Sequence, residues 1–222
     1  MKKIQLNDIK QNKEIKEFLA KTDEYLGIIG YTEHGERHAN ITANFAHDIL
    51  TNLNFSKRDA ELAAIAGYVH DIGNVIGRPY HGQFGTQIIS RILREMGMEN
   101  NEIIPIMAAV GNHEEDYSGN PVNSIAASLI IADKADVHLT RVRTAKMINF
   151  DMHDRVNYAV KKAFLKIKKD QKIISLNLTI DTNISQVMEY FEIFLSRMII
   201  SRRAANFLKC NYELVINKTK LL

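Results

Sequence analysis

Hydrophobic residues recur at helical spacing in one segment after another over the first 140 positions. Ile9, Ile15 and Leu19 follow this period, and so do the apolar positions of 40–53. Residues at such spacing share one face of an α-helix, which neighbouring helices can cover. The pattern predicts a bundle of amphipathic helices.

Caps and breakers set the expected limits of the later helices. Ser56 is a good N-cap for a helix beginning at Lys57, and we expect that helix to end at Gly73. Gly and Pro residues mark loops at 77–79 and 116–121. Three further helices are expected between and after these loops: 86–96, 102–110 and 124–139.

The pattern changes near residue 150. Residues 173–180 alternate and are rich in β-branched side chains, which is typical of a strand, and a charged turn precedes them. With 160–167 they are expected to form a hairpin. A long helix capped by Asn183 or Ser185 and a short strand over 212–216 should follow.

These elements predict a mainly α fold in two parts. Residues 1–150 would form the helical bundle, and residues 151–222 a small β-β-α-β module for dimerisation, for covering a pocket or for regulation. The only cysteine, Cys210, excludes an intramolecular disulfide and a cysteine-based metal site. No apolar run approaches the ~20 residues of a membrane span, and no signal core begins the chain. We therefore expect a cytoplasmic protein without a membrane partner.

The charge is nearly balanced, with a formal net value of +3. Residues 151–222 hold 13 basic and 7 acidic side chains, but no aromatic-rich pattern accompanies them. We interpret this as a solvated basic face, which disfavours a nucleic-acid partner.

Histidines placed beside aspartates carry the candidate chemistry. His70 and Asp71 are adjacent, and neighbours on a helix point ~100° apart, so both could reach one metal or a pair of metals. Mixed imidazole and carboxylate ligands favour a first-row transition metal over calcium. A second dipeptide, His47-Asp48, lies off the apolar face and is interpreted as a surface pair.

The ordered set of these residues resembles the HD superfamily of metal-dependent phosphohydrolases. Its pattern of an early His, a His-Asp pair and a distant Asp reads His38, His70-Asp71 and Asp133 in this chain. The segments 81–85, 112–121 and 131–136 also resemble family motifs, the second as a degraded form of the His-His-Glu…Gly-Tyr-Pro loop of the HD-GYP branch.

The resemblance implies two divalent metals per chain (Fe, Mn, Zn, Co or Ni), with Asp71 bridging them. The six implied ligands are His38, His70, Asp71, His81, His113 and Asp133. The first metal would take His38, His70, Asp71 and Asp133, and the second Asp71, His81 and His113.

Departures from the HD-GYP branch argue against cyclic di-GMP as the substrate. Asn112 replaces the first histidine of its pair, Asn74 replaces its lysine, and Gly119-Asn120-Pro121 replaces Gly-Tyr-Pro.

Cations near the implied ligands are candidates for binding phosphate oxygens. Lys134 and Arg78 are the candidate catalytic cations beside Asp71, and His34 lies one turn before His38. Asp136 could accept a hydrogen bond from a ligating histidine. The remaining candidate site residues are Arg37, Asn112 and Arg141.

The expected function is hydrolysis of a phosphoester bond, in a nucleotide or related small phosphorylated substrate, by metal-activated water. Two alternatives stay open: a non-catalytic sensor of the same fold that binds metal or nucleotide, and a di-iron oxygenase. A homodimer is compatible with each of these functions.

Overall fold

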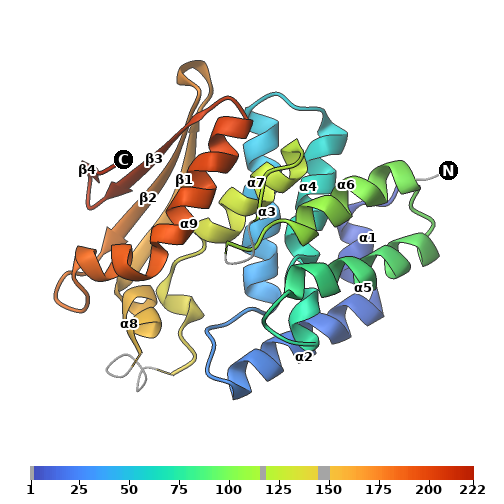
Figure 1. The fold of residues 1–222 in the computed structure, drawn as a ribbon, viewed down its shortest axis with the longest axis horizontal. Helices are drawn as coiled ribbons and strands as arrows, with labels where there is room; N and C mark the ends of the chain where they lie inside the picture. Colours follow the sequence, from blue (N-terminus) through green and yellow to red (C-terminus); the bar gives the residue numbers. More distant parts are fainter. Residues whose placement is uncertain (1–2, 116–118, 145–150) are drawn as a thin grey trace.

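The computed structural model describes residues 3–115, 119–144 and 151–222. Its first part is helical (Figure 1). The helices there are α1 (Leu6–Gln11), α2 (Lys13–Ile28), α3 (Glu36–Asn52), α4 (Lys57–Val69), α5 (His81–Glu95), α6 (Asn100–Gly111) and α7 (Ser124–Ala135). Short 3-10 turns follow α4 at Ile72–Val75 and α7 at Leu139–Arg141.

The C-terminal part combines two helices with a four-stranded sheet. Its elements are α8 (Met152–Ala159), β1 (Val160–Lys168), a 3-10 turn (Lys169–Gln171), β2 (Ile173–Ile180), α9 (Val187–Phe207), β3 (Asn211–Ile216) and β4 (Thr219–Lys220). The strands lie in the order β1-β2-β3-β4, with β2 and β3 parallel and the other pairs antiparallel. The mainly helical fold with a small C-terminal sheet is thereby confirmed, although α8 was not predicted.

The helical part is built around α3, α4 and α7, which pack against one another. Most residues of α4 and α7 are buried, because both helices are rich in alanine and other apolar side chains. At Gly67, an added Cβ would lie 2.9 Å from the backbone of Ala43, so the backbones of α3 and α4 approach closely there. This contact brings the first turn of α3 beside the end of α4.

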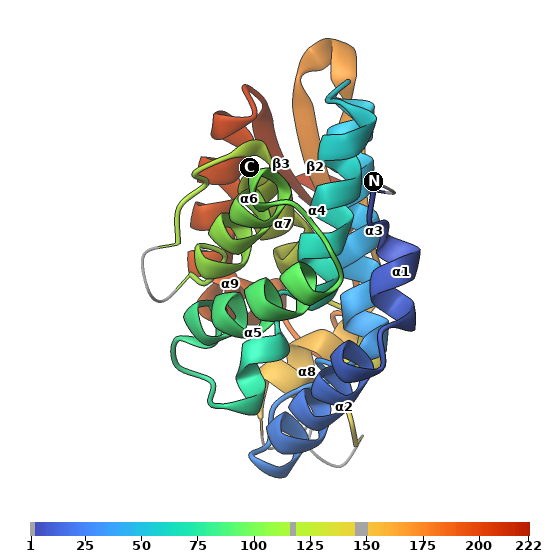
Figure 2. The same ribbon diagram turned by 90° about the vertical axis from the view of Figure 1, so that its right-hand side faces the viewer.

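Helix α9 joins the two parts. It packs against α7 on one side and β3 on the other, and Figure 2 shows it beside α7 from a second direction. Its buried Phe194 and Met198 belong to the same apolar core as the residues of α4 and α7. The C-terminal part therefore shares its core with the bundle.

Several predicted boundaries need correction. The Ser56 cap is confirmed by a hydrogen bond from the Asp59 amide, but α4 ends at Val69, not Gly73. Helix α5 begins at His81, five residues before the predicted start, and α7 ends at Ala135 instead of 139.

The predicted cap of the long helix also needs correction. Helix α9 follows Gln186, so neither Asn183 nor Ser185 caps it, and Ser185 donates instead to Glu189 at 2.5 Å. The predicted 116–121 loop lies partly outside the described residues. None of the described helices is both long and apolar enough to cross a bilayer.

Candidate metal centre

Five elements of the bundle deliver the six predicted ligands to one buried place. His38 lies in the first turn of α3, His70 and Asp71 follow α4, and His81 is the first residue of α5. His113 follows α6, and Asp133 lies near the end of α7. Because α4 ends at Val69, His70 and Asp71 lie in a turn, where adjacent side chains can face the same space.

The four imidazoles meet through their Nε2 atoms. His38 Nε2 lies 3.2 Å from His70 Nε2, and His81 Nε2 lies 3.1 Å from His113 Nε2. The rings of His70 and His113 contact edge to face, with centroids 5.0 Å apart, and join the two pairs. All four side chains are almost completely buried.

The opposite nitrogen of each ring is held by an acceptor. Nδ1 of His70 lies 2.8 Å from the Gly67 carbonyl oxygen, and Nδ1 of His113 lies 2.6 Å from that of Val110. Nδ1 of His81 lies 2.9 Å from the carbonyl oxygen of Arg78. A carbonyl can only accept, so each Nδ1 is a donor, and Nε2 is the nitrogen through which each ring can bind a metal in the cluster.

His38 is held by a carboxylate instead. Its Nδ1 lies 2.7 Å from Asp136 Oδ2, and Arg37 binds the same carboxylate through two nitrogens at 2.8 and 3.2 Å. Arg141, which is also buried, donates to the backbone carbonyls of Asp136 and Glu33. Arg37 and Arg141 therefore hold the residues that orient His38.

Asp71 lies between the two histidine pairs. Its Oδ1 is 3.2 Å from His81 Nε2, and its Oδ2 is 3.2 Å from His70 Nε2 and 3.5 Å from His38 Nε2. Oδ2 is buried and has no hydrogen bond with acceptable geometry among the described residues. A buried anionic oxygen in this condition is costly unless a cation binds it.

Asp133 closes the cluster from α7. Its Oδ1 lies 3.3 Å from His38 Nε2 and 3.6 Å from His70 Nε2. Burial opposes charge on His70, but Asp71 and Asp133 outweigh it and raise the pKa of His70 to about 10. Burial likewise disfavours the charged carboxylates, yet neighbouring His70 helps hold the pKa of Asp71 and Asp133 well below the usual range. The two carboxylates therefore stay charged and favour positive charge beside them.

These donors fit a metal. Ligand atoms ~2.1 Å from one ion, at angles of about 90–110°, lie ~3.0–3.4 Å apart, close to the spacings of the cluster. Two overlapping groups of donors lie within 4.8 Å of one another: His38, His70 and Asp133, and His70, Asp71 and His113. His81 lies next to the second group, because its Nε2 is 3.2 Å from Asp71 Oδ1 and 3.1 Å from His113 Nε2.

Comparison with known proteins agrees with this geometry. Residues 31–140 match the HD domain family, and this range contains all six residues of the cluster. The chain is an HD domain protein. HD domains are typically metal-dependent phosphohydrolases.

The chain is also similar to the uncharacterized protein MJ1020 of Methanocaldococcus jannaschii. The two are 25% identical over 208 residues, which covers 82% of this chain and 79% of that protein. The covered share is larger than the HD domain, so the similarity extends beyond residues 31–140.

A row of ion pairs, not predicted from the sequence, connects the HD domain to the C-terminal part. The ammonium of Lys134 is buried and contacts both Asp133 and Glu115, the latter at 2.6 Å. Arg197 of α9 binds the other oxygen of Glu115 at 3.1 Å. Lys134 is therefore engaged with a cluster carboxylate, and Arg197 is a further cation near the centre.

Arg78 and His34 lie on the opposite side of the HD cluster. Arg78 Nη1 lies 3.2 Å from Asn74 Oδ1 and 3.8 Å from Asp71 Oδ1, and its guanidinium stacks on Tyr31. The His34 ring contacts that of His38, but its Nδ1 lies 2.6 Å from the Thr32 carbonyl oxygen. Asn112 donates to the Ala108 carbonyl and caps α6.

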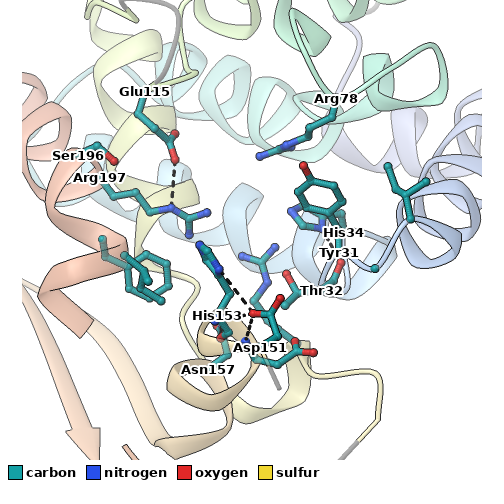
Figure 3. Close-up of a pocket in the computed structure, with 16 residues that line it drawn as sticks. Tyr31, Thr32, His34, Arg78, Glu115, Asp151, His153, Asn157, Ser196 and Arg197 are labelled. Atoms are coloured by element: carbon teal, nitrogen blue, oxygen red, sulfur yellow. Dashed lines mark hydrogen bonds and ion pairs between the residues drawn. The ribbon is translucent and has the colours of Figure 1, made fainter. Parts of the chain in front are cut away.

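A cavity of about 520 Å³ opens beside the cluster (Figure 3). The helical part lines it with Arg78, Arg141 and the 29–34 segment, and helices α8 and α9 of the C-terminal part complete its wall. Figure 3 shows Arg78 and Arg197 directed at the same space from opposite walls. Several guanidinium groups line this pocket, and a metal bound at the neighbouring centre would add positive charge. Such a pocket suits a negatively charged ligand.

The second His-Asp pair lies away from this centre. His47 and Asp48 are on the surface of α3 and contact only weakly, at 3.4 Å. Their interpretation as a surface pair is confirmed. This surface pair shows that a His-Asp dipeptide can bind metal only where the fold brings other ligand atoms close to it.

Proposed function

We propose that this protein is a metal-dependent phosphohydrolase that cleaves a phosphoester bond of a nucleotide or related small phosphorylated substrate. The observation that carries the proposal is the convergence of four imidazole Nε2 atoms and two carboxylates: the Nε2 atoms pair at 3.1–3.2 Å, and three of them lie 3.2–3.6 Å from Asp71 or Asp133. Membership of the HD family and the arginine-lined cavity beside the cluster support it.

The six residues divide into two overlapping sets of ligands around Asp71. His38, His70 and Asp133 would hold one metal with Asp71 Oδ2, and His81 and His113 would hold a second with Asp71 Oδ1. The opposite directions of the two oxygens of Asp71 support this division. Borderline transition metals (Fe, Mn, Zn, Co or Ni) suit this mixture of donors.

Two bound metals supply a water acidic enough to react near neutral pH and positive charge for the phosphate oxygens. The chain's own cations complete the site. Arg78 and Arg197 bind the remaining phosphate oxygens from opposite walls, because each guanidinium has N–H donors that no described residue accepts from. Lys134 holds Asp133 in place through its ion pair.

The proposal is tested by metal content and phosphate release together. Protein purified without chelators is analysed for bound transition metals and assayed against a panel of nucleotides, sugar phosphates and p-nitrophenyl phosphate. We expect about two metals per chain and phosphate release. Asp71→Ala should lower the release by more than about 100-fold, since even outer partners of ligands are worth about 10–100-fold.

The matched control is Asp48→Ala, which removes the aspartate of the surface His-Asp pair. It should keep both metal content and activity. Metal without phosphate release would favour the sensor, and metal with oxygen-dependent turnover would favour the oxygenase. Failure to bind metal after reconstitution would contradict the assignment altogether.

A further inference from the structure

The cavity has two ends of different chemistry. Arg78 and Glu115 lie at the end beside the cluster, because Arg78 contacts Asp71 and Glu115 is joined to Asp133 through Lys134. Asp151, His153 and Asn157 of α8 lie at the opposite side in Figure 3. A substrate with its phosphate at the metals would place its other portion against α8.

The α8 wall presents hydrogen-bond acceptors to the cavity. Asp154 and Asn157 line the cavity and are 7% and 5% exposed. Among the described residues, nothing donates to the carboxylate of Asp154, and the buried Oδ1 of Asn157 has no hydrogen-bond partner. Burial and the nearby Asp151 raise the pKa of Asp154. Such groups are costly in a folded protein unless a ligand pairs with them.

Other polar atoms of this wall are already engaged. Asp151 Oδ1 caps α8 by accepting from the amides of His153 and Asp154, and Asn157 Nδ2 donates to the His153 carbonyl. The two carboxylate oxygens of Asp154 and the amide oxygen of Asn157 are all acceptors. They need donors, and neighbouring hydroxyl groups supply two donors at the spacing of one carboxylate.

Apolar side chains also line the cavity. Ile29, Ile193 and Phe194 contribute to its wall, together with Tyr31. A ring can pack against such a surface while its polar edge reaches the acceptors. The cavity volume of about 520 Å³ is within the ~300–1,000 Å³ typical of sites for small molecules.

We propose that α8 recognises the alcohol portion of the substrate, and that this portion carries vicinal hydroxyl groups, as in a ribose phosphate or ribonucleotide. Asp154 accepts from the hydroxyl pair and Asn157 Oδ1 accepts a further hydrogen bond. This inference rests on the proposed phosphohydrolase activity, which places the phosphate at the metal end.

The test compares substrates that differ in hydroxyl groups. Phosphate release is measured for ribose 5-phosphate, a ribonucleoside 5′-monophosphate, its 2′,3′-dideoxy counterpart and phosphoethanolamine. We expect kcat/KM to be about 10- to 100-fold higher with the two diols, the range of one or two hydrogen bonds to a charged group. Equal rates with the dideoxy nucleotide, or preference for the amine, would overturn the proposal.

Variants of α8 test whether this helix recognises the hydroxyl groups. Asp154→Asn should lower kcat/KM about tenfold for the diols and leave the dideoxy nucleotide unchanged, and Asn157→Leu should act in the same direction. The matched control is Asp170→Asn in the exposed turn between β1 and β2. An equal loss on all substrates would show a structural effect and contradict the specific role.

A binding measurement tests this inference independently of the proposed function. The non-hydrolysable methylenephosphonate of the ribonucleotide is titrated against its dideoxy counterpart, with wild type and Asp154→Asn. Weaker binding of the dideoxy compound to wild type alone supports recognition by α8, even if no substrate releases phosphate. Equal binding of both compounds to wild type refutes it, even if the protein is an active phosphohydrolase.

Discussion

The protonated nitrogen of each imidazole decides what the cluster can bind. Backbone carbonyls hold Nδ1 of His70, His81 and His113, and Asp136 holds that of His38. Each ring therefore directs Nε2, the nitrogen that can bind a metal, at its neighbours. Lone pairs that face one another at 3.1–3.2 Å repel unless a cation or a proton lies between them.

Asp136 is the residue whose role is easiest to isolate. Asp136→Asn keeps an acceptor for His38 Nδ1 but removes the negative charge that makes the imidazole a better ligand. We expect metal affinity to fall about 10- to 100-fold, measured by competition with a chelator. Glu102→Gln, which removes the charge from another carboxylate paired with an arginine, Arg58, is the control. Unchanged affinity in Asp136→Asn would refute its role.

The six residues of the cluster could be predicted from the sequence, but the part of the cavity wall formed by α8 and α9 could not. Histidines beside aspartates are rare enough for their order along the chain to carry information, and that order selects His38, His70-Asp71 and Asp133. Arg197 and Asp154 carry no such signal, because arginine and aspartate usually lie in solvent. Only the packing of α8 and α9 shows that these two line the cavity.

The turn between α4 and α5 illustrates what the pattern of elements misses. A glycine after an apolar helix predicts the end of that helix, yet α4 ends at Val69, four residues before Gly73. Gly73 lies instead against the first turn of α5, where a Cβ would overlap the His81 carbonyl and the Gly85 amide. A contact between segments cannot be read from local propensity.

This close approach predicts a strong effect of Gly73→Ala. The added methyl group must push α5 away, so we expect a loss of about 3 kcal/mol in the free energy of unfolding, measured with denaturant. Metal affinity should also fall, because His81 would move. Gly77→Ala is the matched control, since nothing lies within 4 Å of its Cβ position. Similar stabilities of the two variants would contradict the role of Gly73.

At the scale of the whole molecule, the helical bundle and the C-terminal part act on one site. The bundle supplies the six cluster residues, whereas α8 and α9 supply the far wall of the cavity and Arg197. The division near residue 150 stays a prediction about chain organisation. The shared apolar core and the Glu115–Arg197 ion pair indicate that the C-terminal part helps to form the site.

The central claim, that the buried cluster is a metal centre, is tested most directly by anomalous X-ray diffraction. Crystals grown with manganese would be measured near its absorption edge, for wild type and Asp71→Ala. We predict a peak ~2.0–2.3 Å from Nε2 of His38 and His70, a second one near His81 and His113, and loss of at least one in the variant. Absence of any peak among these residues, or strong peaks only elsewhere, would contradict the claim.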